Sequence, residues 1–228
     1  MVCKHHSCQV NDYCISAVPI FNHLEDEQMA EIMDTVSSAS FKKGEIIYRA
    51  DEEADSLYIV NRGKVKIYRL SESGKELLVR ILDPGDFTGE LALFKKETHE
   101  AYAEAMIDTE ICIIRRSDIE KFLLKYPSIS LQILSEFANR LEQTEKQTTR
   151  FATETVETRL ALFLADLVEN GNNLEFVLPM AKKDLASYLG TTPETLSRKL
   201  LYLEELGLIK QKPKKVIEII DLDGLLLV

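Results

Sequence analysis

The four cysteines of this 228-residue chain are its side chains best suited to redox or metal chemistry. Cys3, Cys8 and Cys14 lie close together at the N-terminus, and Cys112 lies far along the chain. The first residues, MVCKHHSCQVNDYC, contain no apolar run typical of a secretory signal, so we expect a cytoplasmic protein whose thiols stay reduced. Cysteines in such a protein more often serve metals or redox chemistry than structural disulfides.

Three interpretations of these cysteines follow from their types and spacing alone. CKHHSC together with Cys14 could hold a zinc ion with mixed nitrogen and sulfur ligands, although the spacing matches no standard zinc finger. A thiol–disulfide switch between an N-terminal cysteine and Cys112 is the second interpretation. Cys112 alone also fits a small buried core residue, because it stands between Ile111 and Ile113.

A second set of residues, AKKDLASYLGTTPETLSRKLLYLEELGLI (181–209), predicts two helices joined by a tight turn. Gly190 supplies the turn, where a positive φ is needed. Thr192 stands where an N-cap belongs, and Pro193 follows at the first helical position. Gly207 then fits the C′ position that ends the second helix.

The second of these helices has an apolar face and a polar face. Leu196, Leu200 and Leu203 fall on one side, while Glu194 and Arg198 point the opposite way. A leucine stripe opposite a short polar row is what a recognition helix in a DNA major groove requires. The alternative is an ordinary helical hairpin in which the glutamate and the arginine form a solvated i,i+4 pair.

The charge of the chain bears on this prediction. A formal net charge of −10 argues against indiscriminate binding to polyanions, but sequence-specific DNA binding depends more on local charge. Basic residues gather late in the chain. We expect phosphate contacts from this segment, by Lys182, Thr192, Lys199, Lys212 and Lys214.

The elements that must position these residues can be predicted in outline. A short helix is expected over Glu25–Val36, and short alternating runs from Ser40 to Arg116, separated by turn signals, indicate a small barrel or jelly roll. After Pro127 about forty residues have a helical pattern. Their heptad-like stripe predicts the weak, switchable seam of a homodimer, with packing against its own domain as the alternative; its members are Leu134, Phe137, Leu141, Thr144, Thr148 and Phe151.

The predicted fold is therefore α+β, in three parts. Residues 1–126 form a sensory β-roll (jelly roll) that carries the N-terminal cysteines, residues 127–155 the dimerisation helix, and residues 156–228 a winged helix-turn-helix. In the last part, Lys210–Lys215 leads into VIEIID as a β-hairpin wing. No apolar run approaches the length that spans a bilayer, so we expect no membrane partner.

Nothing in the sequence indicates an enzyme. It contains no P-loop, no HExxH, no GxSxG and no dinucleotide fingerprint. The four histidines suggest no catalytic triad, and His99 is expected in an exposed loop.

The order of β-roll, long helix and winged helix-turn-helix resembles the cAMP receptor/FNR (Crp/Fnr) family of bacterial transcription regulators over nearly the whole chain. GDFTGELALF (Gly85–Phe94) is similar to the family's β-roll signature, and LASYLGTTPETLSRKL to its recognition segment. Glu194, Ser197 and Arg198 stand where the FNR branch has its base-reading set. Arginine can bond guanine O6 and N7, glutamate can accept from cytosine N4–H, and serine can do either. The resemblance implies palindromic DNA with FNR-like half-sites, and RNA polymerase as a partner.

The same resemblance bears on a β-roll ligand. Family members that bind cyclic nucleotides hold the phosphate with an Arg–Ser or Arg–Thr pair shortly after the GEL motif. Here Glu100 and Ala101 fall at that place, with no arginine expected near them, and a carboxylate repels a cyclic phosphate. We therefore expect that cAMP is not bound. An organic effector in the roll is an alternative, and the sequence does not name one.

The FNR branch also has an N-terminal cysteine cluster and one cysteine in the strand that carries Cys112, which together hold an oxygen-labile [4Fe–4S] cluster. The resemblance thus implies Cys3, Cys8, Cys14 and Cys112 as cluster ligands and a regulator that senses oxygen or redox state. The Cys8-x5-Cys14 interval equals that of the family, whereas Cys3-x4-Cys8 is longer than the family's x2.

Overall fold

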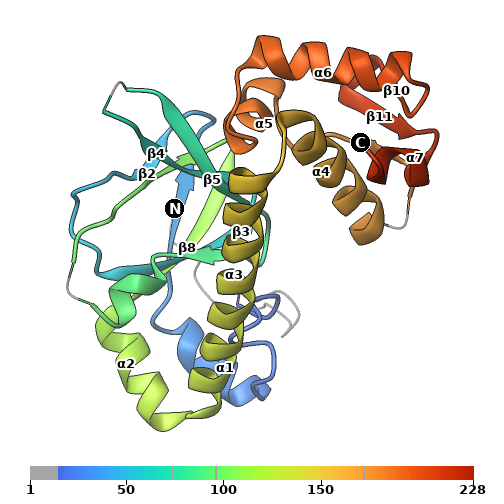
Figure 1. Cartoon of the computed structure of the whole chain (residues 1–228). Helices are drawn as coiled ribbons and strands as arrows, with labels where there is room; N and C mark the ends of the chain where they lie inside the picture. Colours follow the sequence, from blue (N-terminus) through green and yellow to red (C-terminus); the bar gives the residue numbers. More distant parts are fainter. Residues whose placement is uncertain (1–14, 73, 96, 172) are drawn as a thin grey trace. The chain divides into compact units, whose positions relative to one another are not determined.

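The computed structural model describes residues 15–72, 74–95, 97–171 and 173–228, and the chain divides into two compact units, Met1–Leu141 and Glu142–Val228 (Figure 1). The helix α3 (Ser128–Thr153) begins in the first unit and ends in the second.

The first unit contains two four-stranded sheets, as expected of a β-roll. One sheet has the order β1 (Ser37–Phe41), β8 (Thr109–Arg115), β3 (Ser56–Arg62), β6 (Phe87–Thr88). The other has the order β2 (Ile46–Tyr48), β7 (Tyr102–Ala105), β4 (Val65–Leu70), β5 (Glu76–Leu82). All of the strand pairings are antiparallel. The prediction of a jelly roll from short alternating runs is confirmed.

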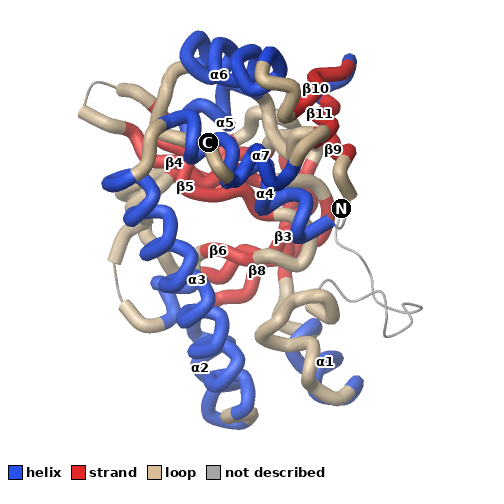
Figure 2. Tube along the Cα trace, turned by 45° about the vertical axis from the view of Figure 1, so that its right-hand side comes forward, coloured by secondary structure: helices blue, strands red, loops and turns tan. Residues whose placement is uncertain are grey.

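Helices cover one end of these strands. The helix α1 (Asp26–Met33) falls within the predicted range, α2 (Arg116–Lys125) follows β8 directly, and the single-turn helix η2 (Glu90–Leu93) follows β6. Figures 1 and 2 show α1 and α2 together at this end of the unit. Its main core joins β3, β6 and β8 to α1, α2 and the first turns of α3; the largest fully buried members include Leu57, Ile59, Phe87, Ile114, Ile119, Ile129 and Ile133.

The helical stretch of about forty residues that the sequence predicts after Pro127 consists of two helices. The helix α3 ends at Thr153, and α4 runs over Val156–Gly171. Thr155 causes the break, because its Oγ1 accepts a hydrogen bond from the backbone N–H of Thr158 at 3.2 Å. A side chain that caps a new helix in this way satisfies an N–H that has no partner within the helix.

The second unit is a winged helix-turn-helix. It packs α4, α5 (Lys182–Tyr188) and α6 (Pro193–Glu205) with a small antiparallel sheet of order β10 (Ile209–Lys212), β11 (Val216–Ile219), β9 (Glu175–Val177). The turn between β10 and β11 is the short helix η3 (Pro213–Lys215), and the short helix α7 (Leu222–Leu226) follows the sheet. The predicted hairpin wing is confirmed; the strand β9 beside it was not predicted.

None of the helices in the described part of the chain combines the length and the apolar character that crossing a bilayer would need.

Candidate DNA-reading site

The recognition helix α6 begins with the capping residues that the sequence predicts. Thr192 is the N-cap, and its Oγ1 accepts a hydrogen bond from the backbone N–H of Thr195 at 3.3 Å. Pro193 occupies the first helical position, where the missing N–H would have no partner in the helix anyway. Gly190 in the preceding turn and Gly207 after the helix have φ values of +67° and +74°. Both predicted positive-φ glycines are confirmed.

The turn before α6 is held against the end of α3. A Cβ built on Gly190 would lie 3.0 Å from Cε1 of Phe151, so the glycine also makes room for that ring. The guanidinium of Arg159 lies 5.0 Å from the centroid of the same ring. Arg150, one residue earlier on α3, pairs with Asp166 of α4 through Nη1 and Oδ2 at 2.7 Å. The recognition helix thus starts from a turn that is fixed to its own unit.

The two faces of α6 differ as predicted. The core-facing leucines, Leu196, Leu200 and Leu203, are completely buried. Glu194, Ser197 and Arg198 are exposed on the outer side, within two turns of the helix start. The structure therefore brings the three predicted base-reading side chains together on one accessible surface; that they read bases stays a prediction.

A hydrogen-bonded group organises this outer surface. Nη2 of Arg198 donates to Oγ1 of Thr195 at 3.3 Å, and Oγ1 of Thr192 donates to the same oxygen at 3.3 Å. A hydrogen bond from its own backbone N–H holds the pKa of the Glu194 carboxyl below its ordinary value, and the nearby positive charge of Arg198 acts in the same direction. The sequence reasoning did not single out Thr195, although its i,i+3 spacing from Arg198 was a usable signal.

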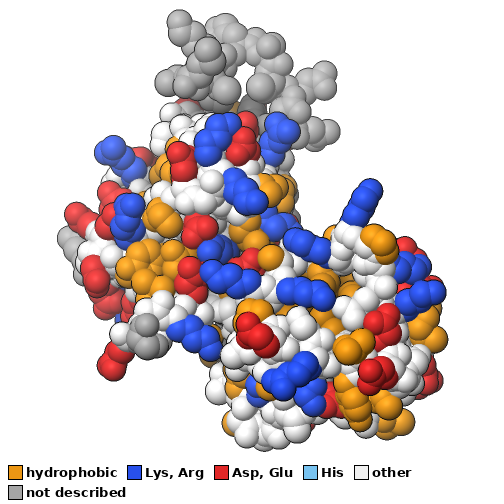
Figure 3. All heavy atoms as spheres, turned by 90° about the horizontal axis from the view of Figure 1, so that it is seen from above, with side chains coloured by type: hydrophobic (Ala, Val, Ile, Leu, Met, Phe, Trp, Pro, Cys, Tyr) orange, Lys and Arg blue, Asp and Glu red, His pale blue; other side chains and the backbone are white. Residues whose placement is uncertain are grey.

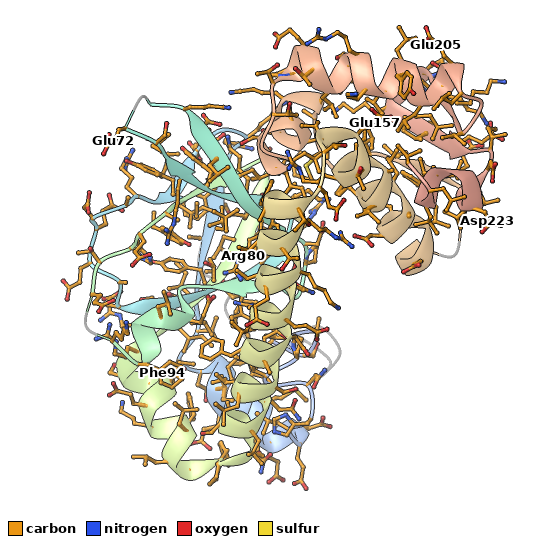
Figure 4. All side chains as sticks on the ribbon, viewed as in Figure 1. Glu72, Arg80, Phe94, Glu157, Glu205 and Asp223 are labelled. Atoms are coloured by element: carbon orange, nitrogen blue, oxygen red, sulfur yellow. The ribbon has the colours of Figure 1, made fainter. Side chains whose placement is uncertain are left out.

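Two of the lysines predicted to contact phosphate are bound by carboxylates of their own unit. Lys212 Nζ lies 2.6 Å from a carboxylate oxygen of Glu175 and 2.9 Å from one of Glu218. Lys199 pairs with Glu157, which Figure 4 labels at the start of α4. A phosphate contact by either lysine would have to compete with these carboxylates.

The other predicted phosphate residues have neutral partners or lie at the wing tip. Nζ of Lys182 donates to Oε1 of Gln211 at 3.1 Å. Lys214 and Lys215 are exposed at the tip and have φ values of +60° and +63°, a region that non-glycine residues seldom adopt. Basic and acidic side chains are interspersed on the face of the molecule in Figure 3. Any attraction to DNA must therefore come from local basic groups such as Lys182 and the lysines at the wing tip.

In the β-roll, one expectation about the predicted cyclic-phosphate position is wrong. Arg69 of β4 forms an ion pair with Glu100, so an arginine does lie there. The pairing arises because β4 and β7 are antiparallel neighbours, which brings together residues far apart in the sequence. The arginine is already bound to a carboxylate, and Ala101 still offers no hydroxyl.

The expectation for His99 is also wrong. Its side chain is not in an exposed loop; the residue is only 7% exposed, and its ring stacks on Tyr48 with centroids 3.8 Å apart. Burial lowers the pKa of His99 and, for the neighbouring phenol, raises the pKa of Tyr48 to about 12. Burial thus favours the uncharged form of both rings.

Glu90, the glutamate of the GEL motif, lies between two arginines. Arg80 of β5 and Arg140 of α3 both donate to its Oε1, at 3.0 and 2.5 Å. Its other oxygen, Oε2, is buried without a hydrogen-bond partner among the described residues. Arg140 also donates to the backbone oxygen of Phe87 at 3.2 Å and lies 4.3 Å from the centroid of its ring. Figure 4 labels Arg80 beside α3. A carboxylate of the roll is thus neutralised by a side chain of the long helix.

Cys112 is the one predicted metal ligand within the described residues; Cys3, Cys8 and Cys14 lie outside them. It is 3% exposed in β8 and belongs to the main core. Its sulfur is disulfide-bonded. Within the part of the chain that the structure describes, no group of three or more His, Cys, Asp or Glu side chains could hold a metal ion.

The state of this sulfur bears on the cluster prediction. Iron–sulfur clusters are held by thiolates, and a sulfur in a disulfide is not a thiolate. In the form that the structure describes, Cys112 therefore does not fit as a cluster ligand. A cluster would require that this bond first be reduced.

The predicted dimer seam lies along α3. Leu134 and Leu141 are 62% and 60% exposed, and Thr144 and Thr148 are exposed between them and the helix end. Phe137 packs instead against the core of its own unit. Phe151, the last member, lies against the Gly190 turn as described above. Leu134, Leu141, Thr144 and Thr148 are thus accessible to a partner, whereas Phe137 and the partly exposed Phe151 also make contacts within the chain.

Comparisons with known proteins agree with this architecture. Residues 38–126 match the cyclic nucleotide-binding domain family, and residues 158–227 match the Crp-like helix-turn-helix domain family. The chain is 37% identical to a protein of Lacticaseibacillus casei named probable transcriptional regulator flp, over 89% of this chain and 92% of that protein. It is 29% identical to the anaerobic regulatory protein of Haemophilus influenzae, over 96% of this chain and 85% of that protein.

Among solved structures, FixK2 from Bradyrhizobium japonicum is 29% identical and superimposes with a TM-score of 0.73, over 83% of this chain and 95% of that chain. The names of the flp protein and of the Haemophilus protein both describe regulators. The β-roll, the long helix, the helix-turn-helix and the matches over both units lead to one assignment: the chain belongs to the Crp/Fnr family of DNA-binding transcription regulators.

Proposed function

We propose that this regulator binds palindromic DNA as a homodimer and that its DNA binding responds to oxygen or redox state through Cys112 and the N-terminal cysteines. In the proposed complex α6 lies in the major groove, where Arg198 reads guanine, Glu194 reads cytosine and Ser197 assists either reading. Support comes from the exposure of all three on one surface and from relatives that carry the name anaerobic regulatory protein. RNA polymerase is the proposed protein partner.

The homodimer part of the proposal rests on the exposed leucines of α3. Large apolar side chains that repeat along one helix are stabilised when a second helix covers them. We expect the double variant Leu134→Glu/Leu141→Glu to sediment as a monomer in analytical ultracentrifugation. Leu124→Glu is the matched control, since Leu124 on α2 is 86% exposed and lies outside the seam. If the double variant and the control had the same mass as the wild type, α3 would not be the dimer helix.

One observation carries the redox part of the proposal: a line of neighbouring residues leads from Cys112 to α3. Cys112 is in register with Ile59 of β3, and Ile59 is in register with Phe87 of β6. The ring and the carbonyl of Phe87 then contact Arg140 of α3. Only Ile59 and Phe87 therefore lie between Cys112 and the helix that would form the dimer seam, so a chemical change at Cys112 can shift that helix through them.

The chemistry at Cys112 has two candidate forms. The first is the [4Fe–4S] cluster with Cys3, Cys8, Cys14 and Cys112 as ligands, which resemblance to the FNR branch supports. The second is a thiol–disulfide switch, and the disulfide-bonded state of Cys112 favours it. Two thiols exchanging with one small-molecule disulfide, such as oxidised glutathione, would give the protein disulfide and two molecules of free thiol. Either form ties the N-terminal cysteines to β8 in one redox state and releases them in the other.

A pair of measurements on the full chain separates these forms. Anaerobically purified protein with a visible absorption band that bleaches in air, together with iron and sulfide, would support the cluster. Colourless protein whose DNA affinity changes with a reductant, and whose Cys112→Ser variant no longer changes, would support the disulfide switch. If DNA affinity were the same in air, with reductant and in Cys112→Ser, the redox proposal would be wrong, while DNA reading by α6 would stand untouched.

A further inference from the structure

The proposed base reading by Arg198 depends on a side chain that is difficult to order. Arginine loses much rotamer entropy when its long side chain is fixed. Bidentate recognition of guanine also needs the guanidinium plane in one orientation. A group that holds the side chain before DNA arrives would reduce this cost on binding.

Thr195 is placed to do this. It lies one turn before Arg198 on the same face of α6, and its Oγ1 accepts a hydrogen bond from Nη2 at 3.3 Å. Only one of the five guanidinium N–H groups is needed for that bond, so the remaining donors stay available for a base. The contact therefore orients the arginine and leaves N–H donors of the guanidinium free to bind a base.

The hydroxyl of Thr195 is itself held in place. It accepts a second hydrogen bond from Oγ1 of Thr192, which in turn caps the helix by accepting from the backbone N–H of Thr195. The side chain of Thr195 is half-buried, and threonine is β-branched, so few χ1 rotamers are open to it. Two hydrogen bonds thus join Thr192 and Thr195 and fix both side chains at the first turn of the helix.

We infer that Thr195 is a positioning residue for base recognition: through its hydroxyl, fixed by Thr192, it pre-orients the Arg198 guanidinium toward the base. This inference rests on the proposed reading of guanine by Arg198. It also gives Thr192 a role inside the chain, in addition to the phosphate contact predicted for it from the sequence. Specificity would then depend on a residue that touches no base.

The test uses full-length protein and fluorescence anisotropy with a duplex selected from a pool of randomised palindromes. A second duplex carries 7-deazaguanine, which lacks N7, at the guanine that Arg198→Ala identifies. Thr195→Val removes the hydroxyl and keeps the shape of the side chain, and Thr195→Ser keeps the hydroxyl. Each is made in the wild-type and in the Arg198→Ala background, and thermal melting checks that all variants fold.

We expect Thr195→Val to weaken binding to the selected duplex about tenfold, as for the loss of one net hydrogen bond, and to reduce the discrimination against 7-deazaguanine. Thr195→Ser should restore both. In the Arg198→Ala background Thr195→Val should change nothing, since there is no arginine to position.

Two results would overturn the inference. Equal weakening by Thr195→Val with and without Arg198 would mean that Thr195 acts on its own, for example on a phosphate. Unchanged discrimination against 7-deazaguanine would mean that it does not position the arginine. The failure of the proposed function itself looks different, because the wild-type protein would then fail to distinguish guanine from 7-deazaguanine at any position.

Discussion

Arg140 on α3 and Glu90 in the β-roll form an ion pair with Nη1 and Oε1 2.5 Å apart, although 50 residues separate them in the sequence. Their side chains are only 19% and 13% exposed, so solvent screens the pair far less than a surface pair. The contact ties the roll to the long helix within one unit. Because Oε2 of Glu90 has no hydrogen-bond partner within the described part of the chain, the carboxylate depends on its two arginines for compensation.

Removing one partner of this pair should therefore destabilise the unit. We expect Arg140→Met to lower the free energy of unfolding by about 2 kcal/mol, since it leaves a buried carboxylate with Arg80 alone. Urea unfolding followed by tyrosine fluorescence measures the effect. Lys146→Met removes an exposed cation from the same helix and should leave the midpoint unchanged.

The double variant Arg140→Met/Glu90→Gln gives the sharper comparison. It removes both charges, so it should recover part of the stability that Arg140→Met loses. If the double variant were less stable than the single variant by the full cost of Glu90→Gln alone, the two residues would not be coupled.

A second prediction concerns the two glycines with positive φ that flank the recognition helix. Gly207→Ala introduces only backbone strain, about 1–2 kcal/mol, because a Cβ there would meet no atom of the described residues within 4 Å. Gly190→Ala should cost more, since its Cβ would press on the ring of Phe151 at 3.0 Å. Urea unfolding of both variants measures the difference. In a Phe151→Leu background, the difference between the two costs should become smaller. If Gly190→Ala cost the same with phenylalanine and with leucine at position 151, the ring contact would not matter.

The DNA-binding unit was largely predictable because its signals are local. Gly190, Thr192 and Pro193 each act within a few residues, so the sequence places the turn, the cap and the helix start. Likewise, the leucine periodicity of α6 corresponds directly to its buried face. The capping role of Thr155 was not singled out, because one threonine stands within a segment whose overall pattern is helical.

The contacts that shape the β-roll could not be predicted, because they join residues distant in sequence. Arg69 meets Glu100, and Arg140 meets Glu90, only once the strands and α3 are assembled. His99 was misjudged for the same reason: it was expected to be exposed, whereas the fold buries its ring against Tyr48. Partners of this kind are set by tertiary packing, which single-sequence patterns do not contain.

His99 gives a prediction of pH dependence. Burial lowers its pKa in the folded protein below the ordinary 6.5, so near and below that pH the unfolded chain binds a proton that the folded chain does not. Stability should therefore fall as pH falls through about 6.5 and toward the folded pKa. His99→Phe keeps an aromatic ring for Tyr48 to stack on but does not titrate.

Urea unfolding of the wild type and of His99→Phe, measured from about pH 7.5 to about pH 5, tests this effect. These two pH limits bracket the ordinary histidine pKa of about 6.5. The free-energy difference between the two proteins should be constant at the upper end and shift in favour of His99→Phe toward the lower end. A difference that does not change with pH would mean that His99 takes up its proton equally well in both states.

The last prediction separates base reading from phosphate contact. Arg198→Ala should weaken binding to the preferred palindrome by about 1–3 kcal/mol per half-site and relax the base preference there. Lys214→Ala should weaken binding to all sequences alike and reduce the salt slope by about one per subunit. Lys212→Ala should reduce the slope less, because Glu175 and Glu218 already neutralise that lysine. Anisotropy titrations over a range of salt concentrations, with preferred and scrambled duplexes, measure all three. An unchanged base preference in Arg198→Ala would mean that another face of α6 meets the DNA, since the groups that could read bases on this face are gathered around that arginine.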